Sequence, residues 1–330
     1  MKIRIGILGA GSLGTLIGGY LAMINSDKYD IEISLFCREA HSIAIRRNGL
    51  ILENEEGRFK IDNIQSYSSG DSVNIISFDY LFLTTKAYDI SDALIEYKEL
   101  ADKCRWLVIF QNGIGNEELV QEYCPAHKII RGVTTNGALL KEPGYIIHTG
   151  KGFTRIGFPF IKLNDSDSEF DMQKEEAREA LEILNDLLNL AGFNCSISDD
   201  IIRDCWEKIF VNVGINSFGA LTRLKNGDLL KIEMIKNLMA EAVKEGLKVA
   251  AGLGINLPDK DFIALTYDVA TKAAENKNSM LQDILKRKRT EIDFINGKIV
   301  HYAKKLGIRV PINELLTALV KGLESSFDYD

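Results

Sequence analysis

The sequence predicts an α/β protein in two parts, an N-terminal doubly wound parallel sheet over residues 1–199 and an all-helical part over residues 200–330. In the first part, short apolar runs of strand length alternate with segments of helical periodicity, which is typical of a parallel sheet covered by helices. A glycine-rich turn joins the first run to the first helix. After residues 194–198 the strand signals stop and only helical periodicity continues. A chain of 330 residues is long enough for two domains with separate cores.

The glycine-rich turn begins where the apolar run at residues 3–8 ends, and a helix is predicted from residue 15. Its G-x-G-x-x-G spacing assigns Gly9 to a tight turn, Gly11 to close approach of a pyrophosphate, and Gly14 to packing of helix on strand. The free N–H groups and the dipole of the helix favour an anion there. We therefore expect a dinucleotide-binding loop, with a purely structural turn as the alternative. The loop consists of Gly9, Ala10, Gly11, Ser12, Leu13 and Gly14.

The end of the second predicted strand, residues 31–36, bears on which dinucleotide binds. In such a sheet an acidic side chain holds the ribose 2′-OH of NAD, whereas an arginine accepts the 2′-phosphate of NADP. Arg38 comes first after the strand and favours NADP. Glu39 follows at once, and a shift of one residue would present its carboxylate instead. The sequence therefore predicts NADP (NADPH), with a plain surface role for Arg38 as the alternative.

The composition argues against several classes of function. A net charge of -7 without a basic tract makes nucleic acid and anionic membranes poor partners. No apolar run approaches the ~20 residues of a membrane span, and the first residues do not resemble a signal peptide. The five cysteines form no C-x-x-C pair and the four histidines are scattered, which suggests neither disulfides nor a metal site. We expect a cytoplasmic, metal-free protein that acts on a small molecule, as a monomer or homodimer.

Two further predicted strands deliver polar residues to their carboxyl ends. The apolar run 80–84 precedes Lys86, and the run 106–110 precedes Asn112. Ligands of open α/β sheets bind outside the carboxyl ends of the strands, so both side chains are placed to face a cofactor. Taken singly, a loop lysine and a turn asparagine are the simpler interpretations. Asn116 is expected to cap the next helix, and residues 68–72 are predicted to form a loop.

The helical half contains one unusual helix, predicted over residues 201–216. It is apolar nearly all round after Lys208, which indicates burial. Its polar exceptions, Lys208, Asn212 and Asn216, have i, i+4, i+8 spacing and therefore lie on one face. Such groups must either be satisfied internally or face a polar cleft. We favour the cleft.

A second helical run is predicted from residue 276 to residue 299. Glu291 lies one turn before Ile295 and borders the buried face, where it either lines a site or pairs with a neighbouring cation. The charged run 286–289 is interpreted as a solvated face. The predicted inward stripe consists of Leu281, Ile284, Leu285, Ile292, Ile295 and Ile299.

Taken together, these segments resemble the ketopantoate reductase (2-dehydropantoate 2-reductase) family, over most of the chain. The resemblance implies NADPH-dependent reduction of ketopantoate to (R)-pantoate, on the pathway to pantothenate and coenzyme A. It also implies a C-terminal domain like that of 6-phosphogluconate dehydrogenase. The matching segments, in order, are the loop at 9–14, T-K-A at 85–87, Q-N-G-I-G at 111–115, W-E-K at 206–208 followed by Asn212 and Asn216, N-G-D-L at 226–229, S-M-L-Q-D at 279–283, T-E-I-D-F-I-N-G at 290–297, and Pro311.

The resemblance also implies roles at the matching positions. Lys208 looks like the catalytic proton donor and a substrate contact, and Glu291 like a second catalytic residue on the cofactor side. Asn112 would touch both the nicotinamide and the substrate. The other implied cofactor contacts are Lys86 and Ala138, and the other implied substrate contacts are Asn212, Asn216, Asn226 and Ser279. Ser217, where many relatives have proline, and the segment 54–77 depart from the family pattern, and neither carries a chemical role.

The implied chemistry suits these residue types, because hydride addition to a ketone builds negative charge on oxygen and a nearby ammonium can donate a proton to it. Since the glycine loop and Asn112 belong to the sheet half and Lys208 to the helical half, we expect the two halves to share one cleft. Three other functions stay open. They are a reductase of another branched 2-oxo acid, an NAD-dependent β-hydroxyacid dehydrogenase with its Lys-x-x-x-Asn pair, and a cofactor sensor without turnover.

Overall fold

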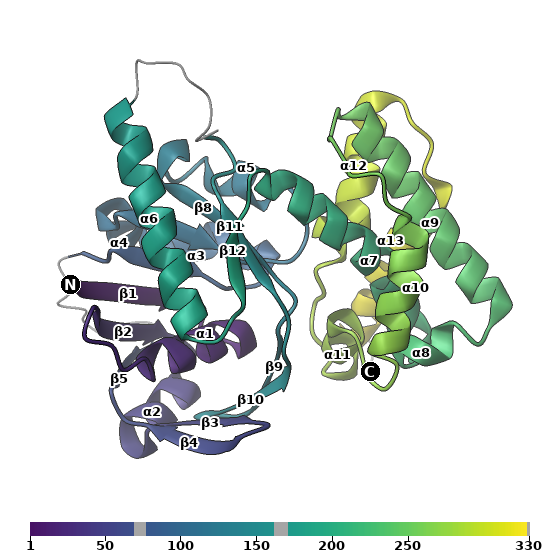
Figure 1. Ribbon diagram of the computed structural model, residues 1–330. Coiled ribbons are helices and arrows are strands. Elements are labelled where there is room, and N and C mark those ends of the chain that lie inside the picture. The colour runs from purple at the N-terminus through teal and green to yellow at the C-terminus, as the bar shows by residue number, and fades with distance from the viewer. Residues whose placement is uncertain (69–76, 162–170, 329–330) are drawn as a thin grey trace. The chain divides into compact units, whose positions relative to one another are not determined.

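The structure is a computed structural model that describes residues 1–68, 77–161 and 171–328 of the chain (Figure 1). The chain forms two compact units. Unit 1 comprises Met1–Gln111 and Asn116–Ile201, and unit 2 comprises Asn112–Gly115 and Ile202–Asp330. Unit 1 is α/β and the secondary structure of unit 2 is helical, so the predicted fold class is confirmed.

Unit 1 is built on an eight-stranded sheet in the order β12-β11-β8-β7-β6-β1-β2-β5. Every neighbouring pair in it is parallel except β11 with β8. The chain winds outward from β1 in both directions, as in a doubly wound sheet. The strands are β1 (Lys2–Leu8), β2 (Asp30–Phe36), β5 (Ile64–Tyr67), β6 (Tyr80–Leu83), β7 (Trp106–Ile109), β8 (Ile129–Thr134), β11 (Thr154–Gly157) and β12 (Cys195–Ile197).

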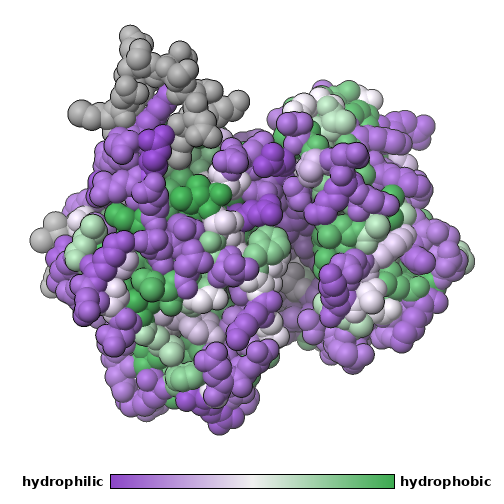
Figure 2. Space-filling view, in the orientation of Figure 1, coloured by the Kyte–Doolittle hydropathy of each residue, from purple (hydrophilic) through white to green (hydrophobic). Residues whose placement is uncertain are grey.

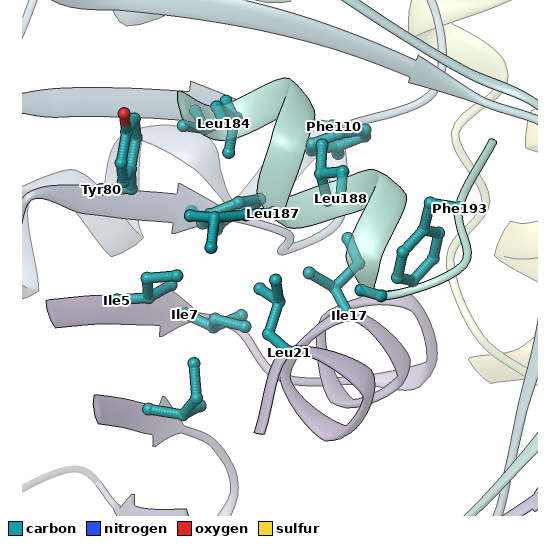
Figure 3. Close-up of a cluster of buried hydrophobic side chains, with 14 of the residues drawn as sticks. Ile5, Ile7, Ile17, Leu21, Tyr80, Phe110, Leu184, Leu187, Leu188 and Phe193 are labelled. Carbon is teal, nitrogen blue, oxygen red and sulfur yellow. The ribbon is translucent and has the colours of Figure 1, made fainter. Parts of the chain in front are cut away.

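Helix α6 (Asp171–Leu190) packs its apolar side chains onto this sheet next to α1 (Ser12–Ala22). Figure 3 shows Leu184, Leu187 and Leu188 of α6 in one buried cluster with Tyr80 of β6 and with Ile5 and Ile7 of β1. All four residues of β6 and all four of β7 are buried, as expected for parallel strands covered on both faces. The other helices of unit 1 are α2 (Glu39–Asn48), α3 (Ile90–Glu96), α4 (Lys98–Lys103) and α5 (Asn116–Val120).

A second, four-stranded sheet packs against the far side of α1, in the order β4-β3-β10-β9. The contact is close at Gly19, where an added Cβ would lie 3.0 Å from Leu52 Cδ1. Neither β9 nor β5 was predicted from the sequence. Strand β9 was missed because it is only half-buried and its residues do not alternate between apolar and polar. The strands are β3 (Leu50–Asn54), β4 (Gly57–Ile61), β9 (Gly137–Glu142) and β10 (Tyr145–Gly150).

Several predicted boundaries need correction. Residues 90–100 have the periodicity of a single helix, but the helix is interrupted at Tyr97, which lies between α3 and α4. Asn116 is the first residue of α5 rather than the cap before it, a difference of one residue. The loop predicted at residues 68–72 lies, apart from Ser68, outside the described residues.

Unit 2 corrects the single helical run predicted over residues 276–299. Helix α11 ends at Leu285, and Arg287 adopts a positive φ of 52°. Leu285, predicted to face inward, is 46% exposed for this reason. The helices of unit 2 are α7 (Ile201–Thr222), α8 (Asn226–Leu229), α9 (Glu233–Gly252), α10 (Phe262–Lys272), α11 (Ser279–Leu285), α12 (Asn296–Leu306) and α13 (Pro311–Ser325), with 3₁₀ turns η4 (Ile292–Phe294) and η5 (Ser326–Asp328).

A buried chain of hydrogen bonds links four helices of unit 2. Ser217 Oγ donates to Asn296 Oδ1 (2.6 Å), and Asn296 Nδ2 donates to Asn313 Oδ1 (3.0 Å). Asn313 Nδ2 donates in turn to Glu245 Oε2 (2.8 Å), whose carboxylate also accepts the N–H of Ile312 at the start of α13 (3.0 Å). A carboxylate at a helix N-terminus is favourable there. Ser217 thus supplies a buried donor that proline lacks, which gives this departure from the family pattern a structural role.

The visible face of each unit carries interspersed hydrophilic and hydrophobic residues (Figure 2). Within the described residues, none of the helices combines the length and the hydropathy that crossing a membrane requires.

Candidate active site

The glycine loop follows β1 and leads into α1 with the geometry that its spacing predicts. Gly9 has φ +73°, and a Cβ added to it would overlap Thr85. A Cβ on Gly14 would likewise overlap Thr84, so helix and strand approach there as closely as glycine permits. Gly11 differs, because the nearest atom to an added Cβ would be Gly9 O at 3.8 Å. This open side of the loop fits a bound pyrophosphate.

The start of α1 adds the electrostatics that an anion requires. The helix begins at Ser12, has no side-chain cap and carries no acidic residue in its first turn. Its first N–H groups have no partner within the helix, and the dipole is positive at this end. Ser12 Oγ accepts the N–H of Leu140 in β9 (3.2 Å), which ties the loop to the strand that carries Ala138.

The other predicted cofactor contacts in unit 1 lie after neighbouring strands of the same sheet. Arg38 is exposed, follows β2 and is the N-cap residue of α2, whose first residue is the equally exposed Glu39. Lys86 follows β6 and is the N-cap residue of a 3₁₀ turn, where it is half-buried. The structure therefore places both Arg38 and Glu39 beyond the end of β2, and the choice between them stays a prediction.

In unit 2, a chain of hydrogen bonds joins three of the predicted site residues. Lys208 Nζ donates to Asn112 Oδ1 (2.8 Å), and Asn112 Nδ2 donates to Glu291 Oε2 (3.4 Å). Glu291 is 6% exposed, whereas Lys208 is only half-buried. The amide of Asn112 therefore lies between two charged groups that fix its orientation. The ammonium of Lys208 can only donate, so it meets the amide oxygen, and the carboxylate of Glu291 accepts from the amide nitrogen.

The segment Asn112–Gly115 is held against η4 and α12. Ile114 N donates to Phe294 O (3.1 Å). Added Cβ atoms on Gly113 and Gly115 would overlap Phe294 and Lys298, so the backbone of this loop packs closely against η4 and α12 of the same unit. The glycines of the Q-N-G-I-G segment are therefore required by close approach and by positive φ values of 93° and 75°.

The remaining predicted substrate contacts lie on three segments that hydrogen bonds bring together. Asn216 is buried on α7, one turn beyond the half-buried Asn212. Asn278, which precedes the exposed Ser279, donates from Nδ2 to Ile215 O (3.4 Å). At the start of α8, Asn226 N donates to Asn276 O (3.0 Å).

Asn226 carries an additional signal of ligand binding. Its side chain is buried, and among the described residues its Oδ1 has no hydrogen-bond partner. An unpaired buried amide oxygen is costly, and a ligand with a donor group would satisfy it.

A buried ion pair that was not predicted from the sequence flanks the Asn112 loop. Arg131 of β8 is 2% exposed, and its Nε lies 3.5 Å from Glu117 Oε2 in α5. Its guanidinium also donates to the carbonyls of Ile109 (3.1 Å) and Gln111 (2.7 Å). Arg131 therefore contacts the chain on both sides of residues 112–115. The available signal was an arginine inside the otherwise apolar strand 129–134.

The described residues contain no cluster of three or more His, Cys, Asp or Glu that could hold a metal ion.

Comparison with known proteins places both units in one family. Residues 5–159 match the family described as Ketopantoate reductase PanE/ApbA, and residues 200–324 match Ketopantoate reductase PanE/ApbA C terminal. A Pyrococcus horikoshii protein named 2-dehydropantoate 2-reductase is 38% identical to this chain over 98% of each protein.

Two solved structures resemble the whole chain. A ternary structure of D-mandelate dehydrogenase with NADH and anilino(oxo)acetate is 26% identical, with a TM-score of 0.86, over 99% of this chain and 100% of that one. A PanE/ApbA family ketopantoate reductase from Ralstonia eutropha is also 26% identical, with a TM-score of 0.83 and the same coverage.

Proposed function

The chain belongs to the ketopantoate reductase family, and on that premise we propose that it reduces ketopantoate to (R)-pantoate with NADPH. The observation that carries the proposal is the hydrogen bond from Lys208 Nζ to Asn112 Oδ1. It fixes an ammonium donor beside a polar amide, on a helix whose same face also carries Asn212 and Asn216. We assign cofactor binding to residues 1–199 and substrate binding to residues 200–330.

When bound, the dihydronicotinamide supplies a hydride to the ketone carbon. Lys208 donates its proton to the ketone oxygen as negative charge develops there, so that the C=O bond becomes an alcohol. Asn112 orients the lysine, and Glu291 holds the amide of Asn112 in that orientation. Asn212, Asn216, Asn226 and Ser279 supply neutral polar groups for the carboxylate and hydroxyl of the substrate. A proton from solvent then restores the ammonium.

Arg38 is proposed to accept the 2′-phosphate of NADPH. Its charge-assisted hydrogen bond is worth about 1.5–3 kcal/mol, which corresponds to roughly ten- to hundred-fold in affinity. Arg38→Ala is therefore expected to raise the Kd of NADPH by that factor and to leave the Kd of NADH nearly unchanged. Fluorescence titration measures both constants. Glu39→Ala is the matched control, because it removes the neighbouring exposed charge and should not weaken NADPH. If the wild-type protein prefers NADH, the carboxylate of Glu39, and not Arg38, determines the choice of cofactor by binding the ribose 2′-OH.

A second candidate function is NADH-dependent reduction of an aryl 2-oxo acid, which the likeness to D-mandelate dehydrogenase favours. A third, NAD-dependent oxidation of a 3-hydroxy acid, shares the lysine and asparagine pair. The test is a rate measurement with NADPH over a panel of 2-oxo acids that includes ketopantoate, beside 3-hydroxyisobutyrate with NAD. The proposal predicts that ketopantoate is reduced fastest. Oxidation of 3-hydroxyisobutyrate in the absence of any 2-oxo acid reduction would assign the chain to a different reaction class. NADPH binding without turnover of any acid would indicate a sensor.

We further propose that the enzyme serves pantothenate and coenzyme A biosynthesis in the cytoplasm, as a monomer or homodimer.

A further inference from the structure

We propose that His41 is a positioning residue for the cofactor, which acts through Thr15 to keep the carbonyl of Ala10 turned away from the phosphates. The proposal rests on the proposed function, because it requires that the glycine loop bind a dinucleotide. His41 lies in the first turn of α2 and is 4% exposed. It belongs to none of the segments that suggested the family.

The directions of the hydrogen bonds around His41 are determined by its partners. Gly144 N donates to Nδ1 (2.8 Å), and a backbone N–H can only donate, so Nδ1 is the acceptor and the ring is neutral. Nε2 then carries the hydrogen and donates to Thr15 Oγ1 (3.0 Å). The hydroxyl of Thr15 in turn donates to Ala10 O (3.0 Å). The result is a one-way relay from Gly144 to the glycine loop.

The relay holds one side of the peptide group that joins Ala10 to Gly11, whose N–H donates to Gly9 O (2.6 Å). The Ala10 carbonyl points to a fully buried hydroxyl, whereas the side of Gly11 that would meet a pyrophosphate is open. A rotation of this peptide would turn a carbonyl oxygen toward the phosphates, where its negative partial charge opposes binding. The relay is therefore expected to affect cofactor affinity more than the chemical step.

The relay also connects the glycine loop to Arg38, the residue predicted to bind the 2′-phosphate. His41 N donates to Arg38 O (2.9 Å), so one residue contacts both the segment that carries Arg38 and, through Thr15, the loop. Gly144 lies in the turn between β9 and β10, and β9 carries Ala138. Three segments predicted to surround the cofactor thus meet at a single neutral imidazole.

Burial lowers the pKa of His41 to about 4, from an ordinary value of 6.5. Because the unfolded chain binds this proton more readily, the contribution of the neutral ring to stability is complete above pH 6.5 and is lost as pH falls toward 4. The free energy of unfolding of unit 1 should therefore decrease as the pH falls through that range, because of this group. His41→Gln should remove that part of the slope in a pH series of urea denaturations. An identical slope in the variant would exclude His41 as its source.

The experiment tests the two ring nitrogens of His41 separately, with two amide side chains that each replace one of them. His41→Gln places an amide nitrogen near the position of Nε2 and keeps the donor to Thr15. His41→Asn places an amide oxygen near Nδ1 and keeps only the acceptor for Gly144 N. Thr15→Val retains the shape of Thr15 but interrupts the relay at its second member. Melting temperature, the Kd of NADPH and NADH, and kcat are measured for each variant of the full chain.

We expect His41→Asn and Thr15→Val each to raise the Kd of NADPH roughly tenfold, the scale of one hydrogen bond. His41→Gln should bind within about threefold of wild type, although its melting temperature falls as much as that of His41→Asn. The double variant His41→Asn, Thr15→Val should bind no more weakly than Thr15→Val, because both changes interrupt one chain. The relay would be contradicted if His41→Gln and His41→Asn weakened NADPH binding equally and if the loss of affinity followed the loss of melting temperature. A wild type that binds neither NADPH nor NADH would instead overturn the proposed function.

Discussion

Lys208→Ala is expected to lower kcat with ketopantoate and NADPH by roughly 10²–10⁴-fold, the effect of losing a general acid. The physical reason is that the ammonium is the donor predicted to neutralise the developing alkoxide, and alanine leaves only water. Stopped-flow measurement of NADPH oxidation at saturating concentrations gives kcat directly. Lys244→Ala is the matched control, since this lysine forms an exposed helical pair with Glu241 and should change nothing.

A second measurement separates a catalytic lysine from a structural one. Lys208→Ala should retain the melting temperature and the Kd of NADPH within a small factor, and small primary amines added to the assay should restore part of the rate. An unchanged kcat would remove Lys208 from the mechanism. A large loss of melting temperature without amine rescue would assign the residue to folding instead.

Arg131→Met is expected to lower the free energy of unfolding of unit 1 by about 3–5 kcal/mol. The variant removes the guanidinium that lies 3.5 Å from the buried carboxylate of Glu117, and with it the donors to the Ile109 and Gln111 carbonyls. Arg105→Met is the matched control, because Arg105 and Glu176 are both about half-exposed and such pairs contribute about 0–1 kcal/mol. Equal losses in the two variants would show that the buried pair is no more important than a surface one.

The two tryptophans allow each unit to be followed separately. Trp106 lies in unit 1 and Trp206 in unit 2. In a Trp206→Phe background, urea denaturation monitored by fluorescence reports the unfolding of unit 1. The double variant Glu117→Gln, Arg131→Met should lose less stability than the sum of the single variants, because both single changes break the same buried ion pair.

Periodicity predicted the elements whose faces differ most in polarity. The apolar runs of β1, β6 and β7 were predicted from the sequence because buried parallel strands carry nearly continuous apolar patterns. The spacing of Lys208, Asn212 and Asn216 placed them on one face of α7, and the helix spans all three. Asn112 was singled out by its place after a strand and Glu291 by its place beside a buried face, and the family resemblance gave them their roles. The structure joins Lys208 to Asn112 and Asn112 to Glu291 by hydrogen bonds.

Contacts between segments that are far apart in the sequence were harder to predict. The pairing of Arg131 with Glu117 and the relay through His41 depend on which segments the sheet brings together, and no local pattern encodes that. The break after Leu285 was missed because the charged run 286–289 fits a solvated helical face as well as a turn. Strand β9 escaped prediction because its exposure is uniform along most of its length.

The central claim is that this chain reduces ketopantoate with NADPH. The most direct test is kcat/KM for ketopantoate with NADPH, measured beside kcat/KM for phenylglyoxylate with NADH on the same preparation of wild-type protein. We predict that the first value is the larger and that the product of the first reaction is (R)-pantoate. A larger value for phenylglyoxylate with NADH, or no NADPH oxidation with ketopantoate, would contradict the claim.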